Sequence, residues 1–179
     1  MPKPKQSEPE RPAPRLYLVT PEIEDAAGFA RSLPEALGAA DVAAVLLRLK
    51  EADERTQINR IKALVPAVQS AGVALVLDGM PELVARSGAD GAHLRDFESF
   101  MAALPALKPD RIAGCGGLGS RDDAMTAAEE GADYVLFGEP DKDGERPSFD
   151  AIMERVEWWA ELFQVPCVAF AASAARSAT

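Results

Sequence analysis

Short apolar runs alternate with longer segments of helical periodicity along the chain from Leu16 onward. Seven of these runs predict buried β-strands, because charged or turn-forming residues bound each run and apolar residues are continuous within it. Strands without an apolar–polar alternation suit a parallel sheet that is covered on both faces. The predicted strands cover residues 16–20, 42–48, 73–77, 91–94, 111–115, 134–138 and 165–171.

The segments between the strands predict six α-helices. The clearest is 54–71, where isoleucine, leucine and valine residues recur at three- and four-residue steps and form one apolar face. Pro34 predicts that the first helix is divided or ended there, and Ser148 predicts the N-cap of the last helix. The predicted helices cover residues 22–38, 54–71, 81–88, 97–104, 121–131 and 148–163.

A Gly-Ala-Asp step recurs where a predicted helix turns into the next strand. It stands at residues 88–90 and 131–133, and a looser copy stands at 38–41. Glycine can take the left-handed conformation that ends a helix, and aspartate can accept hydrogen bonds from turn amides. The steps therefore predict structural junctions at the amino-terminal ends of strands. Seven strands that alternate with six helices predict an α/β fold, a TIM (β/α)8-type barrel that lacks the eighth strand. Any chemistry is expected at the opposite strand ends.

The composition sets limits on function. The chain has 179 residues, which suits one domain, and a formal net charge of −10, which argues against a nucleic-acid or anionic-membrane partner. No apolar run approaches the ~20 residues of a membrane span, so we expect a cytoplasmic protein. Residues 1–15 are rich in proline and predict a disordered tail before a folded domain at 16–179. The two cysteines, Cys115 and Cys167, fall in predicted strands and suit packing.

Six segments together resemble the thiamine phosphate synthase family. They are LYLVTP, LLRLK, LDG, GADGAHL, AGCGG and GADYVLFGEP, and they follow the order of the family from about residue 16 to about residue 170. The ordered set is more specific than any single segment, because Gly-Ala-Asp steps before strands occur in many barrels. The resemblance implies a barrel that binds small phosphorylated substrates, in a divergent member of this family.

The resemblance also implies a magnesium-assisted condensation in thiamine biosynthesis. A hydroxymethylpyrimidine diphosphate loses pyrophosphate, and the nitrogen of a thiazole phosphate captures the resulting cationic carbon. Magnesium and cationic side chains would stabilise the departing pyrophosphate. Carried over to this sequence, Arg48, Lys50 and Gly116 are expected to bind the substrates. Asp78 and Glu98 are expected to bind Mg²⁺, which prefers carboxylate oxygens.

The sequence departs from the pattern of the family at several strand ends. Leu46 stands in place of a glutamine, Leu77 in place of an asparagine and Gly116 in place of a serine, so hydrogen bonds to the substrates are lost. The loop after the sixth strand is acidic, and Lys142 is its counterpart of a lysine in the family. Ala171-Ala172 replaces a Gly-Gly pair whose backbone amides would hold a phosphate.

Alternatives follow from these departures. The chain can be a non-catalytic barrel homologue that binds a ligand or acts in regulation. A thiazole tautomerase is a weaker alternative, because no histidine follows the fifth predicted strand. The single histidine, His93, belongs to a strand motif and is expected to be structural. A barrel without an eighth strand also leaves the edges of its first and seventh strands bare, which predicts a homodimer or a tail that covers the gap.

Overall fold

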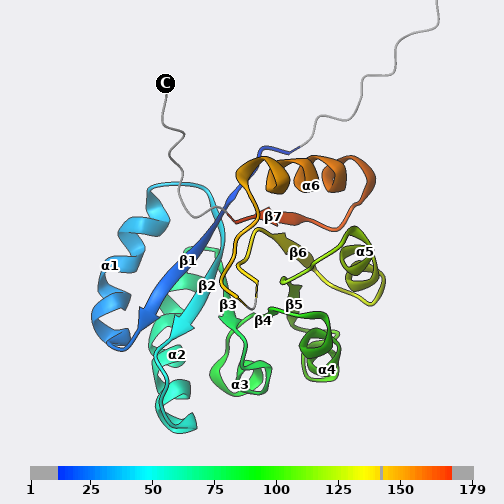
Figure 1. Ribbon diagram of the computed structural model, residues 1–179. Helices are drawn as coiled ribbons and strands as arrows, with labels where there is room; N and C mark the ends of the chain where they lie inside the picture. Colours follow the sequence, from blue (N-terminus) through cyan, green and yellow to red (C-terminus); the bar gives the residue numbers. More distant parts are fainter. Residues whose placement is uncertain (1–11, 142, 171–179) are drawn as a thin grey trace, which may run out of the picture.

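The structure is a computed structural model that describes residues 12–141 and 143–170. Seven strands alternate with six helices, as predicted (Figure 1). The strands are β1 (Leu16–Ile23), β2 (Val42–Leu49), β3 (Ala74–Asp78), β4 (Gly91–Leu94), β5 (Ile112–Cys115), β6 (Tyr134–Phe137) and β7 (Cys167–Ala169). The helices are α1 (Ala26–Gly38), α2 (Glu54–Gln69), α3 (Pro81–Ser87), α4 (Phe97–Leu107), α5 (Arg121–Glu129) and α6 (Phe149–Leu162).

The seven strands form one sheet in chain order, and every neighbouring pair is parallel. Figure 1 shows that the sheet curls and that the helices lie around its outside. The α/β class and the barrel-like parallel sheet are therefore confirmed. Within the described residues β1 pairs with β2 alone and β7 with β6 alone, so the full eight-stranded closure of a TIM barrel is not part of the described structure.

The two faces of the curled sheet carry unlike clusters of side chains. The main core lies between the sheet and the helices, and it includes the fully buried Leu77, Phe100 and Trp159. A much smaller cluster, which includes Leu46 and Val76, packs with Tyr17 and Val19. Because successive side chains of a strand point to opposite faces, Val76 and Leu77 belong to different clusters. The smaller cluster therefore lies on the inner face of the sheet.

The glycine of the repeated Gly-Ala-Asp step ends two of the helices as predicted. Gly88 and Gly131 have positive φ angles of 84° and 107°, which glycine adopts without steric cost. The prediction is wrong for Gly38, which is the last residue of α1. There the cap is Ala39 in a right-handed conformation, with φ −79°, so the looser copy of the step ends its helix without a left-handed residue.

The aspartate of the step bonds to the neighbouring strand. The Asp90 carboxylate accepts the Leu75 amide of β3 at 2.7 Å, and the Asp133 carboxylate accepts the Ala113 amide of β5 at 2.7 Å. Each aspartate precedes its own strand, β4 or β6, and so joins that strand to the one before it in the sheet. The repeat thus fixes strand pairing at the amino-terminal ends, in line with its predicted structural role.

One proline lies inside a helix that it was predicted to divide or end, and another lies inside a strand that was predicted to end one residue before it. α1 continues through Pro34 to Gly38, because Leu33 and Leu37 on one face of the helix are buried and offset the lost hydrogen bond. β1 runs through Pro21 to Ile23, with a register irregularity beside the proline. β1 is an edge strand, where a missing N–H is tolerated. At the other edge, β7 is shorter than predicted.

Other expectations are tested only in part. Residues 12–15 form no helix or strand, and the rest of the predicted tail, Lys142 and Ala171-Ala172 lie outside the described residues. Cys115 and Cys167 are both free, and burial raises the pKa of Cys115 to about 12, which suits a packing role. None of the described helices is long and apolar enough to span a membrane.

Candidate active site at the carboxyl-terminal mouth of the sheet

Asp78 ends β3 and is the centre of a group of ion pairs. Its carboxylate accepts two hydrogen bonds from Arg95, from Nε to Oδ1 at 3.0 Å and from Nη2 to Oδ2 at 2.5 Å. Arg48 Nε lies 3.5 Å from the same Oδ2, and the Asp78 side chain is only 15% exposed. Burial alone would lower the pKa of Arg95, but the hydrogen bonds and charge of Asp78 outweigh this and raise it. Two guanidinium groups therefore cover one largely buried carboxylate.

Arg48 and Lys50, at the end of β2, lie on the same side of the mouth as Asp78. All three line one open cavity, so the structure brings these predicted site residues together. Lys50 donates a hydrogen bond to Glu24 at 2.7 Å and is 57% exposed. It therefore lies toward the outer rim, while Arg48 also lines a second cavity closer to the inner face of the sheet.

Glu98 lies apart from this group. It is an exposed residue in the first turn of α4. The cavity beside Asp78 is lined instead by Asp96 and Ser99 of the same turn. The Asp96 carboxylate caps α4, because it accepts hydrogen bonds from the Ser99 amide at 2.7 Å and from the Ser99 hydroxyl at 2.8 Å. Of the two carboxylates that the resemblance assigns to a metal ion, Asp78 lines both of these cavities, and Glu98 lines neither of them.

A buried chain of hydrogen bonds runs along the inner face of the sheet to the mouth. The Tyr17 and Tyr134 hydroxyls are 2.6 Å apart, and the Tyr134 hydroxyl is 3.0 Å from His93 Nδ1. His93 Nε2 lies 2.9 Å from a Glu139 carboxylate oxygen. Each of these polar atoms has a hydrogen-bonding partner when the Tyr17 hydroxyl donates to Tyr134, the Tyr134 hydroxyl donates to His93 Nδ1, and His93 Nε2–H donates to Glu139. Burial raises the pKa of both tyrosines, so both hydroxyls are neutral donors.

The Glu139 carboxylate fills the space beside Gly116. A Cβ atom at residue 116 would lie 1.9 Å from Glu139 Oε2 and 2.8 Å from His93 Nε2. The Gly116 amide donates to the Leu94 carbonyl, and the next amide, Gly117 N–H, donates to Glu139 Oε2 at 2.9 Å. Gly116 thus makes room for an acidic side chain, where the sequence analysis expected it to contact substrate.

The second cavity, of about 80 Å³, opens on the inner face of the sheet. Arg48, Arg95 and Arg146 line it together with one carboxylate, that of Glu139. The Arg146 guanidinium lies 4.8 Å from the centre of the Phe170 ring, a cation–π contact that holds it over an apolar wall. Three cationic side chains, one anionic side chain and otherwise apolar side chains thus line this cavity.

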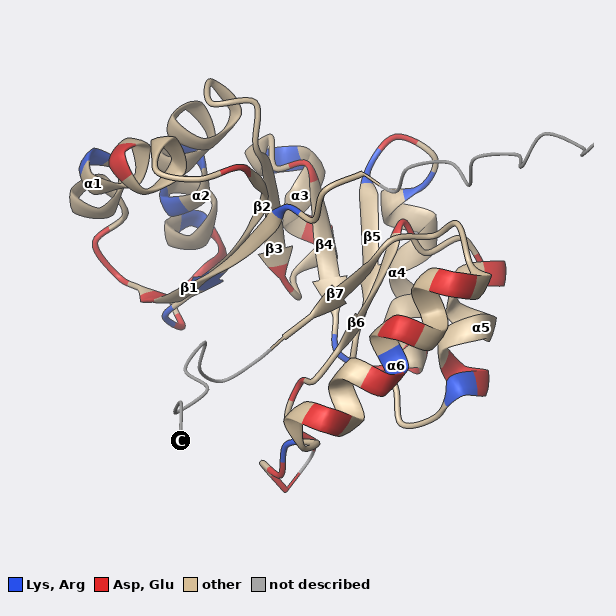
Figure 2. Cartoon of the chain, turned by 90° about the horizontal axis from the view of Figure 1, so that it is seen from above, with Lys and Arg blue, Asp and Glu red and all other residues tan. Residues whose placement is uncertain are grey.

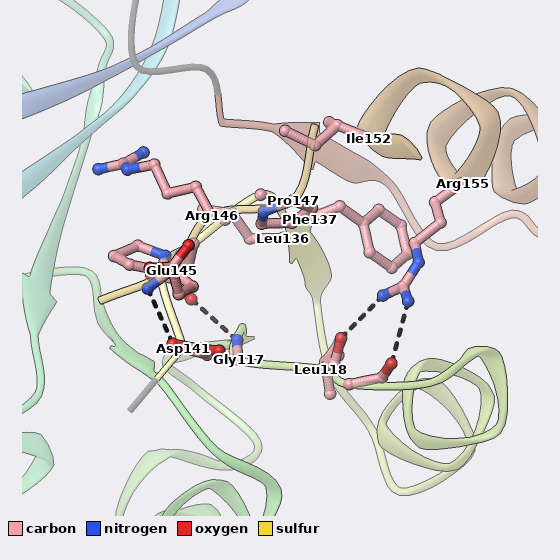
Figure 3. Close-up of a pocket in the computed structure, with 14 residues that line it drawn as sticks. Gly117, Leu118, Leu136, Phe137, Asp141, Glu145, Arg146, Pro147, Ile152 and Arg155 are labelled. Atoms are coloured by element: carbon pink, nitrogen blue, oxygen red, sulfur yellow. Dashed lines mark hydrogen bonds between the residues drawn. The ribbon is translucent and has the colours of Figure 1, made fainter. Parts of the chain in front are cut away.

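A further cavity, of about 360 Å³, lies between α6 and the loops after β5 and β6 (Figure 3). Arg155 of α6 crosses it and donates hydrogen bonds to the Leu118 and Gly119 carbonyls, both at 3.0 Å. These contacts tie α6 to the glycine-rich loop. Figure 3 shows that the Arg146 side chain points away from Arg155, and it lines the smaller cavity as well. Arg146 therefore connects the two cavities.

The arginines at the mouth contrast with the acidic character of the whole chain. Figure 2 shows acidic residues along α6 and in the loop before it, in a chain of net charge −10. Three arginines and one glutamate line the 80 Å³ cavity, and such a local excess of positive charge is what an acidic protein needs to bind an anionic ligand.

Three residues of the mouth were not found from the sequence: Arg95, Glu139 and Arg146. One signal was available for Glu139, because the strand end FGEP has a glutamate where the family has Phe-Gly-Pro. Arg95 and Arg146 belong to loops, where no hydrophobic periodicity indicates which way a side chain points. Arg95 meets Asp78 across 17 residues, and Glu139 meets His93 across 46, so only the folded chain brings them together.

Comparisons with known proteins show the family of the chain. A family model described as thiamine monophosphate synthase matches residues 16–178. The chain is 43% identical over 157 residues to a thiamine-phosphate synthase of Rhodospirillum centenum, with 87% of this chain and 76% of that protein covered. It is 41% identical over 169 residues to a thiamine-phosphate synthase of Hyphomonas neptunium, with 89% and 75% covered.

Solved structures show the same fold. The thiamine phosphate pyrophosphorylase of Pyrococcus furiosus superposes with a TM-score of 0.70 at 24% identity, and 89% of this chain and 75% of that chain are covered. A truncated 3-deoxy-D-arabino-heptulosonate 7-phosphate synthase of Thermotoga maritima superposes with a TM-score of 0.57 at 15% identity, over 87% of this chain and 62% of that one. The curled parallel sheet thus has counterparts among proteins of low sequence identity.

Proposed function

Because the chain belongs to the thiamine monophosphate synthase family, we propose that it joins a hydroxymethylpyrimidine diphosphate to a thiazole phosphate and releases pyrophosphate. The observation that supports this most directly is the meeting of Arg48, Lys50 and Asp78 at one mouth of the sheet. In barrels of this type, the carboxyl-terminal strand ends carry the chemistry.

The reaction breaks one bond and forms another. The bond between the methylene carbon of the pyrimidine and the diphosphate oxygen breaks, and the electron pair leaves with pyrophosphate. The lone pair of the thiazole nitrogen then forms the new carbon–nitrogen bond. The negative charge that develops on pyrophosphate needs donors that are already in position, and Arg48 and Arg95 stand at the mouth for this purpose.

The magnesium ion that the family resemblance implies does not fit the donor set of this structure. Both oxygens of Asp78 accept hydrogen bonds from Arg95, and Glu98 lies apart on α4. The residues that the structure describes contain no group of three or more histidine, cysteine, aspartate or glutamate side chains that could hold a metal ion.

A second candidate function is a non-catalytic homologue that binds a phosphorylated ligand. Glu139 favours it, because this carboxylate occupies the inner mouth where a negatively charged substrate would approach. Leu46 favours it as well, since its apolar side chain lines the same cavity and offers the pyrimidine no hydrogen bond. The two functions differ in turnover and share the binding of phosphates.

An activity assay separates the two functions. The full chain is incubated with both substrates, with and without Mg²⁺, and thiamine phosphate is measured by chromatography. We expect formation of the product and its loss in Arg48→Ala. A matched variant, Arg86→Ala, removes an exposed arginine of α3 that pairs with Glu54 away from the mouth, and is expected to keep the activity of the unchanged chain. Binding of the diphosphate substrate without any product would favour the non-catalytic homologue instead.

We also propose that the chain forms a homodimer through the outer edges of β1 and β7, which pair with no strand among the residues that the structure describes. An unpaired edge presents free N–H and C=O groups to another chain. Leu16, at the start of β1, is 50% exposed and adds apolar surface at one edge. Sedimentation equilibrium is expected to give twice the chain mass, and Val168→Lys in β7 is expected to shift the equilibrium toward the monomer. A stable monomer at high protein concentration would refute this.

A further inference from the structure

The cation that faces Asp78 is a side chain of the protein itself. We propose that Arg95 takes the place of a divalent cation at Asp78, and that Arg48, Arg95 and Arg146 bind the phosphate groups of the ligand without a metal ion. This inference rests on the proposed function, since it takes the mouth to be the place where phosphorylated substrates bind.

The geometry around Asp78 is that of a completed ion pair. Arg95 meets both carboxylate oxygens through Nε and Nη2, which is the two-point fit between a planar guanidinium and a carboxylate. A metal ion would have to displace this fork. It would also have to approach Arg48, whose Nε lies 3.5 Å from Oδ2. Two positive charges beside one carboxylate repel a third, doubly charged cation.

Two of the carboxylates near Asp78, Glu139 and Asp96, already accept hydrogen bonds. Glu139 accepts hydrogen bonds from His93 and from the Gly117 amide. Asp96 accepts hydrogen bonds from Ser99 as the cap of α4. Either carboxylate would have to give up its contacts to become a second ligand. Because Mg²⁺ demands near-ideal octahedral geometry, Asp78 alone is a poor site for it.

The guanidinium groups, by contrast, are placed to meet an anion. Arg48, Arg95 and Arg146 come from β2, from the loop after β4 and from the loop after β6, and all three line the 80 Å³ cavity. Only one carboxylate, Glu139, lines it with them. An arginine side chain has five N–H donors, and Arg95 uses two of its groups on Asp78, so donors remain for phosphate oxygens.

Arg146 is the least constrained of the three arginines. The structure records its stacking on Phe170 at 4.8 Å, and no carboxylate among the described residues pairs with it. Arg48 and Arg95 are each paired with Asp78, so they present part of their charge to a ligand. Arg146 has no such ion pair, so more of its charge is available to an anion in this cavity.

Calorimetry with inorganic pyrophosphate tests the inference on the full chain. Titrations are run in EDTA and in excess MgCl₂ at the same ionic strength. We expect similar affinities in the two buffers, because the protein supplies the cations. Arg146→Ala is expected to weaken binding at least tenfold in both buffers. Arg86→Ala is the matched control and is expected to bind as the unchanged chain does.

Arg95→Ala is the decisive variant. It removes the proposed cation and bares Asp78, so binding in EDTA is expected to fall at least tenfold, and part of it is expected to return with Mg²⁺. Arg95→Lys keeps the positive charge but cannot form the two-point contact with Asp78, and it replaces the alanine variant in this test if that variant does not fold. Binding of the unchanged chain that needs Mg²⁺ would overturn the inference and leave the proposed function standing. Absence of binding in both buffers would overturn it too, and the thiamine phosphate assay would then decide the function separately.

Discussion

The outer and inner faces of the sheet differ in what they bury. Toward the helices, side chains such as Leu77, Phe100 and Trp159 form a continuous apolar core. On the inner face, a small apolar cluster around Val76 gives way toward the mouth to a chain of hydroxyl, imidazole and carboxylate groups. The outer face therefore supplies most of the stabilisation by burial, while the inner face holds polar groups in fixed positions.

A single strand, β3, contributes side chains to both faces. Adjacent residues of β3, Val76, Leu77 and Asp78, point alternately to the inner face, the helices and the mouth. A substitution can therefore be silent for binding and costly for folding, or the reverse, at positions one residue apart.

The largest effect is expected from Leu77→Asn, which is one of the two changes that would restore residues of the family. Leu77 is fully buried in the outer core, so its replacement by asparagine removes buried apolar surface and places an amide group where water does not reach it. We expect the free energy of unfolding to fall by about 3 kcal/mol or more. Leu46→Gln is the matched variant on the inner face, where the amide can reach the small cavity, and it is expected to cost about half as much.

Urea denaturation of both variants measures the two losses of unfolding free energy, and the activity assay measures the effect of each variant on product formation. Leu46→Gln is expected to raise thiamine phosphate formation, because it adds a hydrogen-bonding group to the mouth. Leu77→Asn is expected to leave the rate of the folded fraction unchanged. Equal losses of stability in the two variants, or a gain of activity from Leu77→Asn alone, would contradict the assignment of the two leucines to opposite faces.

These two leucines also show what the sequence could predict. Apolar runs and helical periodicity are local signals, and they were sufficient for all seven strands, all six helices and the barrel-like parallel sheet. The site required contacts between distant residues. The family resemblance treated Leu46 and Leu77 alike as lost contacts, although they face different layers. The role of Gly116 depends on its contact with Glu139, and the environment of Asp78 depends on its contact with Arg95. No local pattern in the sequence indicates either contact.

The next prediction concerns the packing of Gly116 against Glu139 on the inner face. A serine at residue 116 would place its Cβ 1.9 Å from Glu139 Oε2, so the carboxylate must move away from His93. We expect Gly116→Ser to cost about 1–3 kcal/mol of unfolding free energy, as overpacking of an interior does. In the background of Glu139→Ala the clash with the carboxylate is gone and only the 2.8 Å approach to His93 Nε2 remains, so the cost of the serine is expected to be smaller.

A double-mutant cycle by urea denaturation measures this coupling. Ala132→Ser, at the amino-terminal end of β6 and away from the mouth, serves as the control for adding a hydroxyl to a small buried residue. Its cost is expected to be the same with and without Glu139. Additive costs for Gly116→Ser and Glu139→Ala would show that the serine does not meet the carboxylate.

The smallest effect is expected from the two buried hydroxyls that begin the polar chain. The chain has two tyrosines, and burial raises the pKa of both Tyr17 and Tyr134 above the value of 10 that they have in the unfolded state. Their neutral forms therefore favour folding fully below pH 10. This contribution is lost as the pH rises above 10, because the unfolded chain then releases protons that the folded chain keeps.

Tyr17→Phe removes one of the two contributions and tests whether the inner face behaves as a buried polar chain. At pH 8 the variant is expected to lose about 1 kcal/mol, the net value of a hydrogen bond between neutral groups. Between pH 9 and pH 11 the unchanged chain is expected to lose about 1.4 kcal/mol more than the variant, the linkage contribution of one tyrosine over one pH unit. Urea denaturation across this range measures both values. The buried thiol of Cys115 titrates in the same direction, but it is present in both proteins and cancels in the difference. If the two proteins lose stability in parallel up to pH 11, Tyr17 is open to water. The inner face is then not the dry counterpart of the outer core that the hydrogen bonds from Tyr17 to Tyr134 and from Tyr134 to His93 imply.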